Sequence, residues 1–260
     1  MTTQLDGALI LVTRPAAQAE KLCRFIESAG GKALRFPTLE IQASAVEASS
    51  LEEALNSHWL IFTSTNAVDF ALKAFSGKMA QLRHLQLAAV GQATADALQQ
   101  ASLSVACVPA TEFNSEGLLA EPAMQSVDGQ QITIVRGIGG REKLAQTLTS
   151  RGAQVQYLEV YSRRRPDTNN AQLVQALQSH QLQAITITSG EALQNLLSML
   201  DESSAVLLRK LPLVVVSERI RDLAQELGFI QIVVSLQPTD AAILETLTTL
   251  LSGEYSGRSN

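Results

Sequence analysis

Polar or very small residues follow directly after several short apolar segments, where they could bind an anionic ligand. Each precedes a stretch with helical spacing, and a helix N-terminus offers unpaired N–H groups and a positive dipole end. Small residues also let a ligand approach the backbone closely. The pattern predicts binding of carboxylates or phosphates. The candidate binding residues are Arg14, Thr63, Ser64, Gly91, Arg136, Gly137, Thr188, Ser189, Gly190 and Ser217.

Each candidate also has a structural interpretation that the sequence leaves open. A serine or threonine at a helix start is commonly an N-cap. Arg14 and Arg136 could form surface ion pairs, and the glycines from Gly137 to Gly140 could serve only to shape a turn. The recurrence of the same residue types after several segments favours binding.

Motifs for other anion chemistry do not occur in the sequence. No aspartate ends an apolar segment, which argues against Mg²⁺-assisted phosphoryl transfer. The stretch 136–140 has GxGG spacing instead of the dinucleotide fingerprint, and no GxxxxGK[ST] loop is present. Cys23 and Cys107 form no CxxC pair, and the three histidines form no HExxH motif, so we expect no metal and no cofactor.

The candidate residues need elements that bring them to one edge of a sheet. Six apolar segments run without alternation, as strands covered on both faces do, and helical spacing follows several of them. This order predicts an α/β protein with parallel sheets, in which ligands bind at the carboxyl ends of the strands. The six segments are 8–13, 58–64, 85–90, 131–135, 183–189 and 211–217.

The two halves of the chain repeat each other. The first matched pairs of residues lie 122 positions apart, and two further segments match in the same order. Three ordered matches indicate an internal duplication of three βα units. The pairs are Arg14 with Arg136, Gly30 with Gly152, Thr63-Ser64 with Thr188-Ser189, and Gly91 with Ser217.

A second extended segment follows the first βα unit of each half, at 32–41 and 154–166. Pro37 and Pro166 mark breaks in regular structure in these segments, which predicts a chain that leaves one domain for another. Tyr157 and Tyr161 are four positions apart, so we expect them on one face of a strand, toward a ligand between the domains. The alternatives are a hinge-packing role for the tyrosines and a solvated charge cluster at Arg163–Arg165.

Composition excludes several classes of partner. The net charge is −5 and aromatic residues are few, so we expect no nucleic-acid surface. No apolar run reaches the roughly 20 residues of a membrane span, and the first residues show no signal-peptide pattern. Because the two cysteines are isolated and no coiled-coil pattern is apparent, we expect a cytoplasmic monomer.

The whole chain resembles the uroporphyrinogen-III synthase family. The resemblance rests on the ordered segments LVTRP, FPTLEI, IFTSTNAV, AAVGQATADAL, VRGIGGREKL, YLEVY, ITSGEAL and VVSERI. It implies two parallel-sheet α/β domains joined by a two-stranded linker. The first domain would comprise residues 1–35 and 165–260, the second 42–157, and the linker strands 36–41 and 158–164.

The resemblance also implies an enzyme, a lyase that closes hydroxymethylbilane to uroporphyrinogen III with loss of water and inversion of ring D. This linear tetrapyrrole carries acetate and propionate arms, which the candidate residues would hold between the domains without cofactor or metal. Tyr161 matches the family's cleft tyrosine, a candidate proton donor to the departing hydroxyl. Transient contact with hydroxymethylbilane synthase, which makes the substrate, is a further expectation.

One segment departs from the family pattern. Many relatives carry a Gly-Pro-Thr-Thr-like turn where this chain has Val216–Arg219. Because a carboxylate beside an anionic substrate would repel it, we expect Glu218 to point away or to cap its helix.

Two other functions fit parts of the pattern. A two-domain protein could close on an anion without catalysis, and retention of the substrate without turnover would reveal it. A nucleotide-sensing regulator fits less well, because the glycine fingerprints fail and the chain is acidic.

Overall fold

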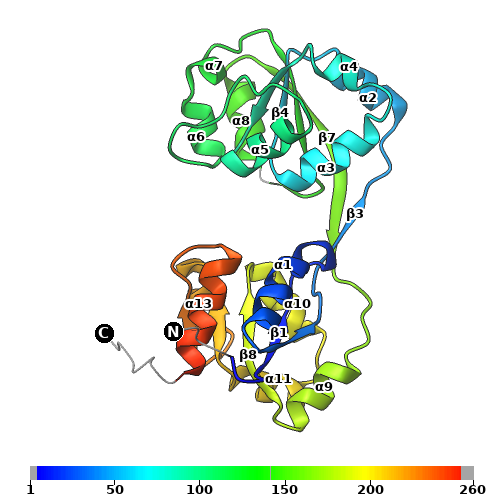
Figure 1. Ribbon diagram of the computed structural model, residues 1–260. Coiled ribbons are helices and arrows are strands. Elements are labelled where there is room, and N and C mark those ends of the chain that lie inside the picture. The colour runs from blue at the N-terminus through cyan, green and yellow to red at the C-terminus, as the bar shows by residue number, and fades with distance from the viewer. Residues whose placement is uncertain (1–4, 141, 253–260) are drawn as a thin grey trace. The chain divides into compact units, whose positions relative to one another are not determined.

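A computed structural model describes residues 5–140 and 142–252 of the chain (Figure 1). The chain divides into two compact units, and only the second is continuous. The first unit combines Met1–Glu40 with Arg164–Asn260, and the second is Ile41–Arg163. Among the described residues, each unit is built on one sheet of five strands.

The sheet of the first unit brings together strands from both ends of the chain. The strand order is β10-β9-β8-β1-β2, and all four neighbouring pairs are parallel. The strands are β1 (Leu9–Val12), β2 (Lys32–Arg35), β8 (Leu182–Ile187), β9 (Leu213–Val215) and β10 (Ile232–Val234).

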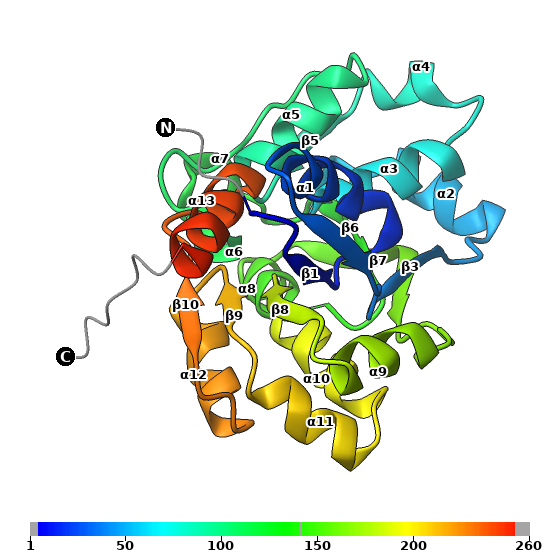
Figure 2. The ribbon, with the colours of Figure 1, turned by 60° about the horizontal axis from the view of Figure 1, so that its bottom comes forward.

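Helices cover both faces of this sheet, as the continuously apolar strands require. Ile10 and Val12 pack toward α1 (Ala16–Ser28) and α13 (Asp240–Leu251), whereas Leu11 packs toward the other helices. Figure 2 shows α1 and α13 on one side of β8, with the other helices on the opposite side. Those others are α9 (Ala171–Gln178), α10 (Gly190–Ser198), α11 (Glu202–Arg209) and α12 (Glu218–Glu226).

The second unit has a closely related sheet. Its order is β3-β7-β6-β4-β5, and the pairs β7–β6, β6–β4 and β4–β5 are parallel. Beside β5, Ala88 forms a parallel bridge with Cys107, the place that β10 takes beside β9 in the first unit. The strands are β3 (Glu40–Ala43), β4 (Trp59–Phe62), β5 (Gln86–Ala89), β6 (Gln131–Gly137) and β7 (Gln154–Arg164).

Two groups of helices cover the second sheet. One face carries α2 (Ala48–Leu55), α3 (Thr65–Ala74), α4 (Met79–Leu82) and α5 (Gln92–Gln100). The other face carries α6 (Ser115–Ala120), α7 (Pro122–Gln125) and α8 (Lys143–Ser150). Each face is an apolar core of its own, so the strands between them are buried.

The first βα unit of each half pairs with strands of the other half. β1, from the first half, lies between β2 and β8, and β6, from the second half, lies between β7 and β4. All six apolar segments are strands, and the predicted α/β class with parallel sheets is confirmed. Of the segment 158–164, the part up to Tyr161 pairs with β6.

Candidate functional site

The carboxyl ends of β4 and β6 border a cavity of about 280 Å³ in the second unit. Five candidate binding or catalytic residues line it, and all five lie at or beyond the ends of these strands or on β7. They are Thr63, Ser64, Arg136, Gly137 and Tyr161. Gly91 lies beyond β5, where its neighbour Val90 lines the cavity.

Ser64 owes its position to the start of α3. It is the N-cap residue in extended conformation, and its Oγ accepts a hydrogen bond from the Ala67 N–H at 3.1 Å. Thr63 donates its hydroxyl to the Val135 carbonyl at 3.2 Å and so ties β4 to β6. The N-cap interpretation of Ser64 is therefore correct, and the same oxygen also contacts the Tyr161 hydroxyl.

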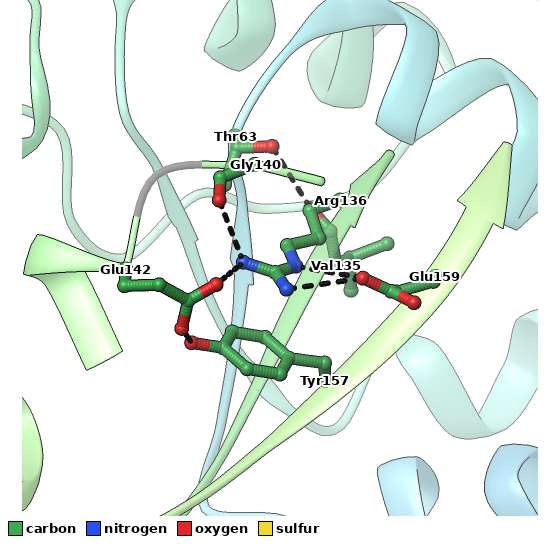
Figure 3. Close-up of polar contacts among 7 residues, drawn as sticks. All are labelled: Thr63, Val135, Arg136, Gly140, Glu142, Tyr157 and Glu159. Carbon is green, nitrogen blue, oxygen red and sulfur yellow. Dashed lines mark hydrogen bonds and ion pairs between the residues drawn. The ribbon is translucent and has the colours of Figure 1, made fainter. Parts of the chain in front are cut away.

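Arg136 is nearly buried, and its guanidinium is surrounded by acceptors (Figure 3). Its Nη1 donates to Glu142 Oε1 at 2.8 Å and to the Gly140 carbonyl at 3.3 Å. Its Nε and Nη2 lie 3.1 and 3.0 Å from Glu159 Oε1. The guanidinium also stacks on the Tyr157 ring, 3.5 Å from the ring centroid.

The ionisation of this cluster follows from its contacts. Hydrogen bonds from Tyr157 and then from Arg136 lower the pKa of the Glu142 carboxyl. Burial opposes the charge of Arg136, but hydrogen bonds to Glu142 and Glu159 outweigh it and raise the pKa of the guanidinium. Two carboxylates thus surround one cation, so the ion-pair interpretation of Arg136 describes its state in this structure.

Tyr161 lies on β7 with 2 % of its surface exposed. Its hydroxyl is 3.2 Å from Ser64 Oγ and accepts a hydrogen bond from Arg163 Nη2 at 3.2 Å. Phe70 stacks against the ring with centroids 5.7 Å apart. A Cβ at Gly137 would lie 2.5 Å from two ring carbons, so the absence of a side chain there makes room for this tyrosine.

The prediction that Tyr157 and Tyr161 share a face is wrong. Tyr157 packs with the core beside α8, whereas Tyr161 belongs to the opposite core beside α3. The register of β7 with β6 shifts between Arg136 and Gly137, where Arg136 pairs with Glu159 but Gly137 pairs with Tyr161. An extra residue at such a β-bulge reverses the alternation of side chains.

The first unit places its candidate residues at the corresponding strand ends. Arg14 follows β1 and pairs through Nη1 with Asp240 of α13, and both side chains are largely buried. Ser189 is the N-cap of α10 and accepts from the Ala192 N–H at 3.1 Å. Gly190 opens the same helix, and the half-buried Thr188 directly precedes the cap.

Ser217 occupies the N-cap position of α12 without a side-chain cap hydrogen bond. Glu218 lies in the first turn of this helix, where it is exposed and paired with Arg221. This exposed position agrees with the expectation that Glu218 points away. The roles of the ten candidate residues and of Tyr161 in binding or catalysis stay predictions.

Sequence reasoning missed three contacts that define these strand ends. Glu142 and Glu159 compensate Arg136, and Asp240 compensates Arg14. It also left Arg163 in a solvated cluster, although this side chain lines the cavity beside Tyr161. Its spacing of two from Tyr161 on a strand was the available signal.

Within residues 5–140 and 142–252, no group of three or more His, Cys, Asp or Glu side chains is placed to hold a metal ion. The same residues include no helix with the length and apolar character needed to cross a membrane.

The fold and the strand ends define a class, namely duplicated parallel-sheet α/β proteins with polar cavities at the carboxyl edge of a sheet. A family model described as uroporphyrinogen-III synthase HemD matches residues 19–245. The uroporphyrinogen-III synthase of Escherichia coli K12 is 34 % identical over 92 % of this chain and 99 % of its own length. The chain therefore belongs to the uroporphyrinogen-III synthase family.

Solved structures agree in fold. A mutant uroporphyrinogen III synthase from the extremely thermophilic bacterium Thermus thermophilus has a TM-score of 0.64 and 16 % identity, covering 94 % of this chain and 99 % of its own. The Helicobacter pylori 26695 uroporphyrinogen-III synthetase has a TM-score of 0.63 at the same identity and coverage. These neighbours confirm the fold class.

Proposed function

We propose that this chain is a cyclising hydro-lyase that converts hydroxymethylbilane to uroporphyrinogen III with inversion of ring D. The supporting observation is family membership over nearly the full length of the Escherichia coli relative, which is named for this product. The cavity of the second unit supports the same reaction, because a phenol and a guanidinium meet there.

Loss of the terminal hydroxyl from the bilane gives an electrophilic azafulvene, and attack by the substituted carbon of ring D gives a spiro intermediate. Fragmentation and recombination of that intermediate invert the ring. Tyr161 is the proposed proton donor to the departing hydroxyl. Tyr161 is one of the residues that line the cavity, and general acids of this kind contribute roughly 10²–10⁴-fold.

Most of the catalysis is proposed to be conformational. Without restraint the bilane can close without inversion, so the enzyme must hold a flexible substrate in one reactive shape. Fixing a reactive geometry can contribute about 7–11 kcal/mol in favourable cases. The proposed anchors for the carboxylate arms are the candidate residues at the strand ends of both units, except Arg136, whose guanidinium already contacts Glu142, Glu159 and the Gly140 carbonyl. Four of them stand at helix starts, where backbone N–H groups are unpaired: Ser64, Gly91, Ser189 and Ser217.

Three properties complete the proposal. The protein works in the cytoplasm, supported by two buried free cysteines whose thiols have pKa values raised by burial, and it works as a monomer. It accepts its unstable substrate through transient contact with hydroxymethylbilane synthase. The segments 36–41 and 158–164 link two domains, 1–35 with 165–260 and 42–157, which is supported by the two compact units.

A coupled assay tests the reaction. Hydroxymethylbilane is generated in place by its synthase, and the uroporphyrin isomers are separated after oxidation. We expect this protein to shift the product from isomer I to isomer III, and Tyr161→Phe to slow that shift by about tenfold or more. Persistence of isomer I with bound bilane would instead establish an anion-binding protein without catalysis.

A further inference from the structure

Two arginines line the cavity of the second unit, and they differ in what surrounds them. We infer that Arg163, and not Arg136, is the guanidinium that binds a substrate carboxylate there. The inference rests on the proposed function and names one contact of the same site.

Every guanidinium nitrogen of Arg136 already has an acceptor. Its Nε and both Nη atoms contact Glu159, Glu142 or the Gly140 carbonyl, and the Tyr157 ring covers one face of the guanidinium. A ligand would have to displace an ionised carboxylate from a side chain that is 7 % exposed. Arg136 instead holds the loop that follows β6 in place.

Arg163 is exposed. Within the part of the chain that the structure describes, it has no carboxylate partner, and only its Nη2 donates a hydrogen bond, to the Tyr161 hydroxyl at 3.2 Å. Nη2 has a second N–H, which together with an N–H of Nε or of Nη1 can donate two parallel hydrogen bonds. This fork matches the geometry of a carboxylate.

The charges around the cavity also favour Arg163 over Arg136 as the group that attracts a carboxylate. Among the described lining residues only Arg136 and Arg163 are charged. Arg136 with Glu142 and Glu159 amounts to one negative charge, which would repel an acetate or propionate arm. Arg163 therefore supplies the attraction on this wall, and it does so beside the phenol.

The contact with Tyr161 gives the anchored carboxylate a defined place. A carboxylate on Arg163 would lie within a few ångströms of the phenol oxygen, because the guanidinium is already hydrogen-bonded to it. One arm of the substrate would thus be fixed next to the proposed proton donor. Arg163 is a binding and positioning residue in this scheme, and the proton stays with Tyr161.

The experiment measures binding of uroporphyrin III, a stable octacarboxylate, by fluorescence titration. The variants are Arg163→Gln, which retains hydrogen bonding without charge, and Arg163→Lys, which retains charge. Arg164→Gln is the matched control, because the neighbouring Arg164 loses the same charge but pairs with Glu40 outside the cavity lining.

We expect Arg163→Gln to raise the Kd roughly 10- to 100-fold, as loss of a charge-assisted hydrogen bond predicts. Arg163→Lys should recover part of that loss, and the affinity of Arg163→Gln should depend less on salt. Arg164→Gln should change the Kd by about twofold or less. In the coupled assay, Arg163→Gln should raise the KM for hydroxymethylbilane more than it lowers kcat.

Equal affinities of Arg163→Gln and Arg164→Gln would overturn the inference. So would a fall in kcat at unchanged KM and Kd, because Arg163 would then act only on the tyrosine. If Arg163→Gln is folded by circular dichroism and the unaltered protein still makes isomer III, either result leaves the proposed function intact. If the unaltered protein makes only isomer I, the proposed function fails, and this inference fails with it.

Discussion

Arg14 and Arg136 occupy equivalent positions in the two units, two residues beyond Val12 of β1 and within the last two residues of β6. Their partners differ. Arg14 pairs with Asp240, which α13 brings to the edge of the sheet. Arg136 pairs with Glu159 on the adjacent strand and Glu142 before α8, and it stacks on an aromatic ring.

The difference shows how a duplicated framework acquires distinct surroundings. Both halves retained an arginine and a serine N-cap at the carboxyl edge of the sheet. In the second unit the hydroxyl of the N-cap serine, Ser64, also contacts the phenol of Tyr161. Among the described residues, the hydroxyl of Ser189 has no such contact. The position equivalent to Gly137 in the first unit is Pro15, the N-cap residue of α1.

The largest expected effect is the loss of stability when either arginine is replaced by alanine, and its cause differs between the two units. Arg14→Ala and Arg136→Ala should each lower the free energy of unfolding by about 3 kcal/mol. In the first unit the loss comes from Asp240, a carboxylate left unpaired at 13 % exposure, so adding Asp240→Asn should restore much of it. In the second unit Glu142→Gln should restore nothing, because the loss comes from packing and the loop contact.

Urea unfolding can assign each loss to its unit. Trp59, the single tryptophan of the chain, lies on β4 of the second unit and is buried there. Arg136→Ala should shift the unfolding transition that tryptophan fluorescence follows. Circular dichroism follows the unfolding of both units, so it should show a shift for Arg14→Ala as well as for Arg136→Ala. If Asp240→Asn and Glu142→Gln restored the free energy of unfolding equally, the proposed difference in cause between the two arginines would be wrong.

Gly137→Ala tests whether the second unit is built around the tyrosine. A Cβ would lie 2.5 Å from the ring of Tyr161, so we expect a loss of about 2 kcal/mol. Gly91→Ala is the control, since its Cβ would meet its nearest neighbour, in Phe113, at 3.4 Å. Thermal unfolding of both variants measures the difference, and equal losses would show that Tyr161 shifts without penalty.

Ser64→Ala and Ser189→Ala compare the two N-caps. Each should lower stability by about 1 kcal/mol, because each loses one cap hydrogen bond. Ser64→Ala should additionally reduce formation of isomer III in the coupled assay, since Ser64 alone contacts Tyr161 among the two serines. Ser64→Thr retains the hydroxyl and should keep both properties.

The smallest effect concerns the acid dependence of the Arg136 cluster. Because the pKa of Glu142 is lowered in the folded state, its contribution is present above its ordinary value of 4.5 and is lost as the pH falls through the folded value below that. Glu142→Gln should therefore lower Tm at pH 7, and the difference should vanish in acid. A difference that persists throughout the acid range would place its origin in packing.

The sequence predicted what depends on local pattern. Continuous apolar segments became strands, and the residues after them became helix starts, because burial on both faces and N-capping are local requirements. The ion pair of Arg14 escaped prediction because its partner comes from a distant element. Asp240 is 226 positions from Arg14, and the local sequence around either residue does not indicate that the two side chains pair.

The prediction that Tyr157 and Tyr161 share a face of β7 failed for a different reason. Alternation along β7 holds from Val155 to Val160 and then breaks at the register shift, so Val160 and Tyr161 enter the same core. A bulge is set by pairing with β6 and leaves no pattern in the strand itself. The same shift put Arg163 beside the cavity, and counting by two from Tyr161 would have placed both residues together.

The exchange of first βα units has a consequence for biosynthesis. A ribosome delivers residues in order, and domains generally fold as they emerge. β1 is made first, yet its neighbour β8 is complete only when Ile187 has been added. The continuous unit Ile41–Arg163 is synthesised before then, so we expect β1 to join β8 only after the middle of the chain has folded.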